Sequence, residues 1–200
     1  MSKTRFEAFS DGVFAFAITL LVLGFVLPKV RVTSNAELTA KLLALWPNAL
    51  AYGLSFLAIG IMWQNHQAIM RLVKRVDRTT VFWNLGLLAG TAFIPFATNA
   101  IGQYPAMKAS AFLYGITLVE TAICFNGMLT HLARTNAFKE SVSNARIGAT
   151  RRLYLFGFGS YTAAMVVSLV WPVASFVAYV GIALAFLIPR GVDDDITDTD

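Results

Sequence analysis

The sequence has little of the chemistry on which enzymes, nucleotide-binding proteins and metalloproteins depend. Cys124 is the single cysteine among 200 residues, so neither a disulfide framework nor a cysteine-based metal site is available. The two histidines, His66 and His131, are far apart and lack a companion at metal-ligand spacing. The sequence has no P-loop, glycine-rich nucleotide loop or Ser/His/Asp arrangement. We therefore expect neither enzymatic activity nor a cofactor.

Charged residues are also scarce, at 14% of the chain, whereas 57% of the residues are hydrophobic and occur in long runs. A soluble core of this size cannot bury so much apolar surface, so we expect an all-α polytopic protein in the lipid bilayer. We expect residues 1–190 to form one transmembrane domain and the acidic residues 191–200 to form a disordered cytoplasmic tail. Windows of about 20 apolar residues predict six transmembrane helices, near Arg5 to Leu27, Leu43 to Met70, Val81 to Ala100, Ala109 to His131, Leu153 to Val170 and Val173 to Ile188.

Basic residues are unevenly distributed between the two sides of these predicted spans. With the N-terminus inside, twelve of the 16 lysines and arginines fall on the inner side and four on the outer side. The positive-inside rule then predicts that both termini are cytoplasmic, in a multi-pass protein of the plasma membrane. This topology accounts for the basic bias, and no basic module with interleaved aromatic residues indicates nucleic-acid binding.

The first hydrophobic segment, Arg5 to Leu27, is unusual because Arg5, Glu7 and Asp11 crowd its front end. Membrane helices normally exclude ionisable groups, so these residues either flank the interface or belong to a built site. Behind them, helical spacing brings an apolar stripe with one hydroxyl onto one side of the helix. This stripe consists of Phe16, Thr19, Leu20 and Leu23. Spacing alone favours the simpler interpretation, in which the stripe faces lipid or a neighbouring helix.

The motif Arg5-x-x-x-Phe9-Ser10-Asp11, followed by an apolar helix, resembles the signature of the transmembrane protein 175 family. That family comprises potassium-permeable channels of endolysosomes and their prokaryotic relatives. The resemblance implies that the first helix lines a pore for potassium ions, and that a chain with one copy of the motif assembles as a homotetramer. It also implies a hydrophobic constriction at Phe16, Leu20 and Leu23 and a selectivity layer at Thr19. The family usually has isoleucine or leucine where this chain has Phe16.

The second predicted span ends in polar residues at the depth of the motif, and Trp63, Asn65, His66 and Gln67 are among them. Because lipid offers no hydrogen-bond partners, polar groups at one depth of a bundle are expected to pair. We therefore expect a cluster in which His66 and either Asn65 or Asn84 join the motif residues Arg5, Ser10 and Asp11. The alternative is an interfacial belt, in which Trp63 and Trp83 only anchor the helices at headgroup level.

Glu120 is a carboxylate placed in the middle of a predicted span, where it must face the bundle or water. It is a candidate for an ion pathway or for a protonated structural role. Gly86-x-x-x-Gly90 permits close helix packing within or between subunits.

Together these features predict a potassium-permeable cation channel with a hydrophobic constriction and weak potassium/sodium selectivity. The sequence has no Thr-Val-Gly-Tyr-Gly filter, so a ladder of backbone carbonyls is not expected to select the ion. The alternative is a secondary transporter or proton pathway that uses Asp11, His66 and Glu120 as relay groups.

Overall fold

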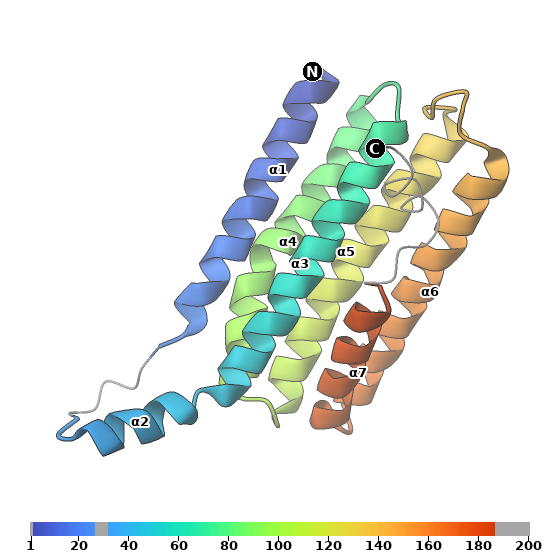
Figure 1. Cartoon of the computed structure of the whole chain (residues 1–200). Coiled ribbons are helices and arrows are strands. Elements are labelled where there is room, and N and C mark those ends of the chain that lie inside the picture. The colour runs from blue at the N-terminus through green and yellow to red at the C-terminus, as the bar shows by residue number, and fades with distance from the viewer. Residues whose placement is uncertain (1, 27–31, 187–200) are drawn as a thin grey trace.

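Helices make up nearly all of the regular structure in residues 2–26 and 32–186, the part of the chain that this computed structural model describes. The long helices lie side by side and alternate in direction, and α1 occupies one edge of the bundle (Figure 1). The helices of the described part are α1 (Lys3–Leu20), the 3-10 helix η1 (Leu21–Gly24), α2 (Asn35–Leu43), α3 (Trp46–Leu72), α4 (Arg78–Gln103), α5 (Lys108–Arg134), α6 (Asn144–Ser168) and α7 (Pro172–Ala185).

Four of these helices are capped at their N-terminus by a short polar side chain, which accepts a hydrogen bond from a backbone amide of the first turn. Ser2, Ser34, Asp77 and Ser143 accept from the amides of Arg5, Glu37, Thr80 and Arg146 respectively. Proline lies in the first turn of α3 and of α7, where a missing amide hydrogen is harmless. Helix α4 continues through Pro95.

Each of the six predicted spans overlaps one helix of the described part, but two expectations need correction. The first span does not remain α-helical to its predicted end, because it tightens into the 3-10 helix η1, and Phe25 and Val26 after it are not helical. Gly24 lies close to α4, since a Cβ at this position would be 3.7 Å from the Cβ of Asn99. In addition, the short helix α2 precedes α3 and meets it at an angle of 44°. The predicted acidic tail, residues 191–200, lies outside the described residues.

By length and composition, three of the described helical segments can cross a membrane, namely α1 with η1, α4 and α5. The bent pair α2 and α3 makes a fourth when it is counted as one span, and α7 is apolar but shorter. The pair α1 and η1 has a length of roughly 35 Å, which exceeds the hydrocarbon thickness of about 30 Å. The expected number of six spans therefore remains a prediction.

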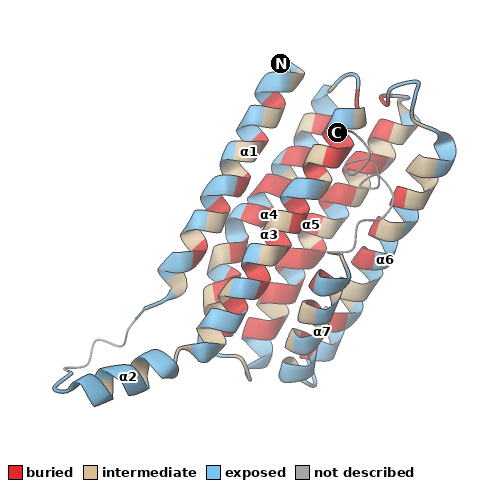
Figure 2. Ribbon diagram, viewed as in Figure 1, coloured by how far each residue is buried: buried red, intermediate tan, exposed pale blue. Residues whose placement is uncertain are grey.

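The core lies between the long helices, with α4 and α5 at its centre, and exposed residues cover the outer faces (Figure 2). Helix α1 packs against α3 and α4, whereas α6 and α7 pack on the far side against α5. The glycines of α4 allow α5 to approach closely. A Cβ at Gly86 would lie 2.8 Å from the Cys124 sulfur, and a Cβ at Gly90 would collide with the Glu120 carboxyl group. This glycine pair therefore serves packing within the subunit.

Candidate pore helix and its polar network

Helix α1 has two faces with different surroundings. One face holds it to the bundle, and its residues are buried: Phe6, Ser10, Phe14, Ala17 and Leu21. The residues of the opposite face are exposed in the described part of the subunit: Arg5, Phe9, Gly12, Phe16, Thr19 and Leu23. Phe16 and Leu23 are 65% and 68% exposed, so most of the predicted stripe is free to contact something outside the subunit.

Leu20 differs from its predicted companions because it lies at the flank of the exposed face and is partly buried. The Thr19 hydroxyl donates to the carbonyl of Phe16 at 2.8 Å, so its hydrogen is used within the helix. Thr19 is nevertheless exposed, so its oxygen can still accept a hydrogen bond. The sequence order of apolar, hydroxyl and apolar positions is thus kept on the exposed face.

A chain of hydrogen bonds on the buried face connects three helices. The Asn84 amide nitrogen on α4 donates to the Ser10 hydroxyl on α1 at 2.9 Å. The Asn84 carbonyl oxygen lies 3.0 Å from Nε2 of His66 on α3, and the Ser10 hydroxyl donates to the carbonyl of Phe6 at 3.0 Å. Every link runs from a donor to an acceptor if His66 carries its proton on Nε2. Neutral side chains therefore join the motif to α3 and α4.

His66 is fully buried between two aromatic rings of α1. The Phe6 ring stacks on the imidazole with centroids 5.9 Å apart, and the Phe14 ring is tilted against it at 5.6 Å. The Nδ1 atom is buried and has no hydrogen-bond partner in the described part of the chain. A proton on Nδ1 would add an unsatisfied donor and a charge, so the neutral Nε2–H form is the one that fits this environment.

Asp11 belongs to a separate branch of polar contacts between α1 and α3. The indole nitrogen of Trp63 donates to an Asp11 carboxylate oxygen at 2.9 Å, and the Gln67 side-chain amide donates to the same oxygen. Trp63 is thus a hydrogen-bond donor to the motif as well as a residue near the end of the bundle. The common depth of Trp63, Gln67 and Asp11 was visible in the sequence, but their pairing was not.

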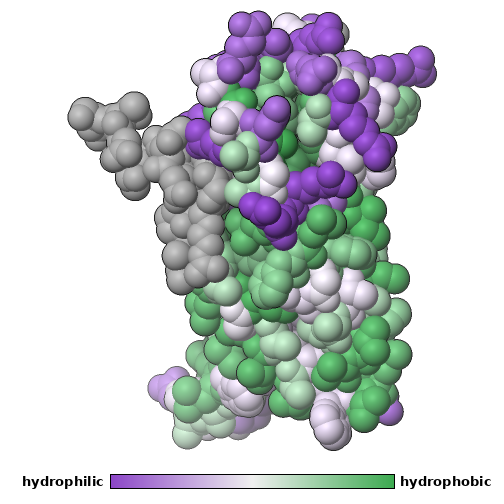
Figure 3. Space-filling model, turned by 90° about the vertical axis from the view of Figure 1, so that its right-hand side faces the viewer, coloured by the Kyte–Doolittle hydropathy of each residue, from purple (hydrophilic) through white to green (hydrophobic). Residues whose placement is uncertain are grey.

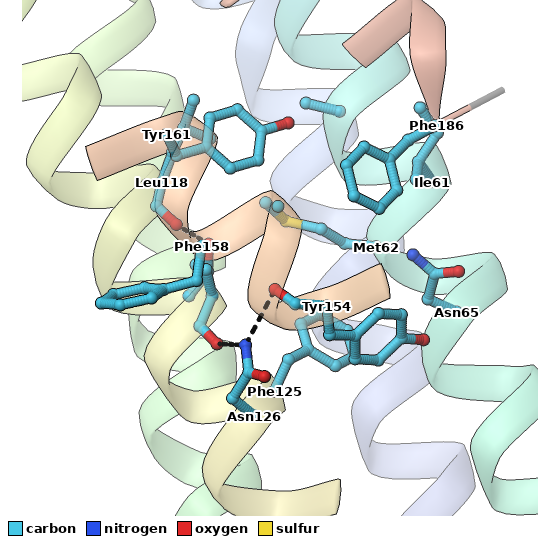
Figure 4. A pocket seen from close by; sticks show the side chains of 14 residues that line it. Ile61, Met62, Asn65, Leu118, Phe125, Asn126, Tyr154, Phe158, Tyr161 and Phe186 are labelled. Carbon is cyan, nitrogen blue, oxygen red and sulfur yellow. Dashed lines mark hydrogen bonds between the residues drawn. The ribbon is translucent and has the colours of Figure 1, made fainter. Parts of the chain in front are cut away.

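Two residues predicted for the cluster lie outside it within the subunit. Arg5 is on the exposed face of α1 and forms no ion pair within residues 2–26 and 32–186, and the neighbouring Glu7 pairs with Lys3 at 3.5 Å. Asn65 instead lines a cavity between α3, α5 and α6, together with aromatic residues such as Phe125 (Figure 4). The sequence allowed either Asn65 or Asn84 in the network. Asn84 is the residue that joins it, because its side chain on α4 bonds to both Ser10 and His66.

Glu120 is partly buried at the interface of α5 with α4. One carboxyl oxygen accepts a hydrogen bond from the Cys124 thiol at 3.3 Å, and the other is buried without a partner in the described part of the chain. Within the described part, Glu120 forms no hydrogen bond with Asp11 or with His66. The three residues proposed as relay groups therefore occupy different environments.

Comparison with known proteins identifies the fold and its signature. A family profile described as "Endosomal/lysosomal potassium channel TMEM175" matches residues 5–95, which include the motif, α3 and most of α4. A potassium channel of Chamaesiphon minutus is 38% identical over 170 residues, covering 83% of this chain and 84% of that protein. The chain belongs to the TMEM175 family. A potassium channel of Streptomyces collinus is 40% identical over 162 residues, covering 78% of each protein.

The architecture agrees with that of a solved TMEM175 protein. The crystal structure of a lysosomal potassium-selective channel TMEM175 homologue from Chamaesiphon minutus matches with a TM-score of 0.84 and 35% identity, covering 93% of this chain and 96% of that chain. The human endosomal/lysosomal proton channel TMEM175 is 33% identical over 134 residues, covering 62% of this chain and 27% of that protein. The family resemblance predicted from the Arg5 to Asp11 motif is confirmed. The family consists of ion channels, which are not a class of enzyme.

Proposed function

We propose that this chain is the subunit of a potassium-permeable cation channel in which α1 lines the pore. The observation that carries the proposal is the exposed face of α1, where a hydroxyl lies between large apolar side chains. The opposite face is fully engaged with α3 and α4, so α1 is held firmly while its exposed face contributes little to the stability of the subunit. Relatives of similar length that are named potassium channels support the same function.

One α1 helix cannot enclose water, so we propose a homotetramer with four copies of α1 around a central axis. Arg5 fits this assembly because its guanidinium lies on the exposed face, where a partner must come from water, lipid or another subunit. Native mass spectrometry in a mild detergent tests the assembly, and a population of monomers and dimers alone contradicts it.

In this arrangement Phe16, Leu20 and Leu23 form apolar rings and Thr19 forms a ring of hydroxyls. The Thr19 ring lies about 4.5 Å along the axis from Phe16, and the Leu23 ring lies roughly 12 Å from it. A potassium ion passing the apolar rings must lose part of its hydration shell, and these rings can also close the pore by dewetting. The Thr19 oxygens offer partial replacement of that shell, which gives weak discrimination between potassium and sodium.

Single-channel recording from purified protein in a lipid bilayer tests the pore. Phe16→Ala widens the proposed constriction and is expected to raise the unitary conductance, whereas Thr19→Val is expected to shift the reversal potential in a potassium/sodium gradient. The matched control is Phe156→Ala, because Phe156 on α6 is 68% exposed and lies on a helix that packs only at the far side of the bundle. If the unitary conductance is the same in the wild type, in Phe16→Ala and in Leu23→Ala, α1 does not line the pore.

We further propose that the membrane is the plasma membrane and that both termini are cytoplasmic. The loops between α3 and α4 and between α5 and α6 lie at the same end of the bundle as the N-terminus of α1 (Figure 1). These loops, the adjoining turns and the first turn of α1 contain nine of the 16 lysines and arginines. Labelling of a single introduced cysteine at Ser2, in intact and in permeabilised cells, tests this orientation after Cys124→Ala.

Proton permeation is a second candidate, favoured by the buried neutral His66 and by the similarity to the human endosomal/lysosomal proton channel TMEM175. It is distinguished by the reversal potential, which follows the pH gradient in a proton pathway and the potassium gradient in a potassium channel. A coupled transporter differs from both because its flux saturates and shows no unitary currents.

A further inference from the structure

A groove opens on the outer surface between α4, α5 and α6, at the end of the bundle where α1 begins. Its volume is about 410 Å³, which is within the usual size range of small-molecule sites of roughly 300–1,000 Å³. Residues lining it on α5 run from Ile123 to Arg134, a span of roughly 16 Å at 1.5 Å per residue. The groove lies away from α1, because α6 packs against α5 and α7 only among the principal helix contacts.

Most of the residues that line the groove away from its mouth are apolar, and Asn126 and Thr130 are the polar ones among them. The Trp83 ring packs directly on Gly127. A Cβ at this position would lie 2.6 Å from a ring carbon, so the contact requires a residue without a side chain. Leu155 and Phe158 of α6 form the opposite wall. The face that α6 and α7 present is an apolar band below a hydrophilic cap (Figure 3). Along α5 the groove runs from Arg134 at the end of the helix to Ile123, within a helix that is long and apolar enough to cross a membrane.

The mouth of the groove is basic. Arg134 is the last residue of α5, is exposed, and forms no ion pair within residues 2–26 and 32–186. Next to it, Nε2 of His131 lies 2.8 Å from a carboxylate oxygen of Asp77, so the acidic group at this mouth already has a partner. Arg151 is exposed and lies one turn before Leu155 on the same face of α6. Two arginines are thus available to an anion at the mouth.

We propose that this groove binds one anionic phospholipid, with its phosphate at Arg134 and an acyl chain along Gly127, Leu155 and Phe158. The length of the groove supports a lipid rather than a soluble anion. One leaflet of the hydrocarbon core is about 15 Å deep, which matches the roughly 16 Å of α5 along the groove. Trp83 is amphipathic and suits the boundary between headgroup and acyl chain. The proposal concerns a single subunit and does not depend on α1 lining a pore.

The test is native mass spectrometry of the purified full-length protein with phosphatidylglycerol or phosphatidylcholine added. Arg134→Gln is expected to lower the preference for phosphatidylglycerol about five-fold, the factor that corresponds to about 1 kcal/mol for one basic residue near an anionic surface. The charge-matched control is Arg75→Gln, because Arg75 is also exposed at this end of the bundle and does not line the groove. This control is expected to leave the preference unchanged.

A second variant tests the apolar part of the groove. Leu155 is 47% exposed, so Leu155→Trp can fill the groove without disturbing the core, and it is expected to lower the binding of both lipids. Glycerol phosphate, which lacks acyl chains, is expected not to displace phosphatidylglycerol at equal concentration. Equal losses in Arg134→Gln and Arg75→Gln overturn the proposal, as does full displacement by glycerol phosphate, because the groove would then contribute nothing.

Discussion

The hydrogen bond between Ser10 and Asn84 is the best place to measure how strongly the motif is fixed to the bundle. Both side chains are buried, and the nitrogen-to-oxygen distance is 2.9 Å. Interhelical hydrogen bonds in membrane proteins contribute about 0.6 kcal/mol on average and about 1.7 kcal/mol at most. A double-mutant cycle with Ser10→Ala and Asn84→Ala is therefore expected to give a coupling free energy of about 0.6 kcal/mol, and less than about 2 kcal/mol.

The single variants are expected to differ for a structural reason. Asn84→Ala removes two interhelical hydrogen bonds, to Ser10 and to His66, so it is expected to cost at least about 1.2 kcal/mol before any cavity cost is added. Ser10→Ala removes one such bond together with the local bond to the Phe6 carbonyl. Ser168→Ala is the matched control, because this buried hydroxyl donates only to the Met165 carbonyl of its own helix.

The assay is reversible unfolding in mixed micelles, followed by far-ultraviolet circular dichroism at constant protein concentration because assembly affects apparent stability. A coupling free energy indistinguishable from zero would refute the hydrogen bond as a tie between α1 and α4. A coupling free energy well above about 2 kcal/mol would exceed the range of interhelical hydrogen bonds and would also contradict the assignment of this contact as one such bond.

Three further predictions test other contacts. Gly90→Val is expected to force α4 from the Glu120 side chain and to cost about 1–3 kcal/mol in unfolding free energy, whereas Gly53→Ala is the control because nothing lies within 4 Å of its Cβ position. Asp11→Ala is expected to lower the yield of assembled protein in gel filtration, and Asp11→Asn to preserve it, because asparagine still offers a carbonyl oxygen to Trp63 and Gln67. Hydrogen bonds from the Thr80 amide, His131 and the Thr80 hydroxyl lower the pKa of Asp77 to about 2 from its ordinary 3.8. The stabilisation from this carboxylate is therefore complete above its ordinary pKa and is lost as the pH falls through about 2. Amide hydrogen exchange in the first turn of α4 is therefore expected to become faster as the pH falls from 3.8 to about 2. The same change in pH is expected to have a smaller effect in Asp77→Asn.

The positions of the long helices could be predicted because each of them contains a long run of apolar residues. The apolar pattern did not predict where each helix ends, because contacts in the folded protein determine those positions. Gly24 ends the first helix early because it lies against Asn99, a residue far away in the sequence. Helix α2 was not predicted, because Asn35–Leu43 is short and contains the charged residues Glu37 and Lys41. A search for runs of about 20 apolar residues does not find such a segment.

The polar contacts of the motif were predictable by depth but not by partner. Residues at one level of a bundle are expected to pair, and this rule predicted that Ser10 and His66 join either Asn65 or Asn84, of which Asn84 lies between them in the structure. Choosing between Asn65 and Asn84 requires the rotation of α3 and α4 about their axes, which spacing along one helix does not define. The same limit explains why Asp11 was expected beside His66, whereas its hydrogen bonds come from Trp63 and Gln67.

Substitutions on the two faces of α1 are expected to have different consequences. Substitutions at Phe6, Ser10 or Phe14 alter contacts with α3 and α4, so they change folding whatever their effect on transport. Substitutions at Phe16, Thr19 or Leu23 touch little inside the subunit, so evolution or an engineer can exchange them at low cost in folding. In the proposed channel, a library restricted to these three exposed positions would vary permeation on an almost constant scaffold, which would make α1 a convenient place to redesign ion preference.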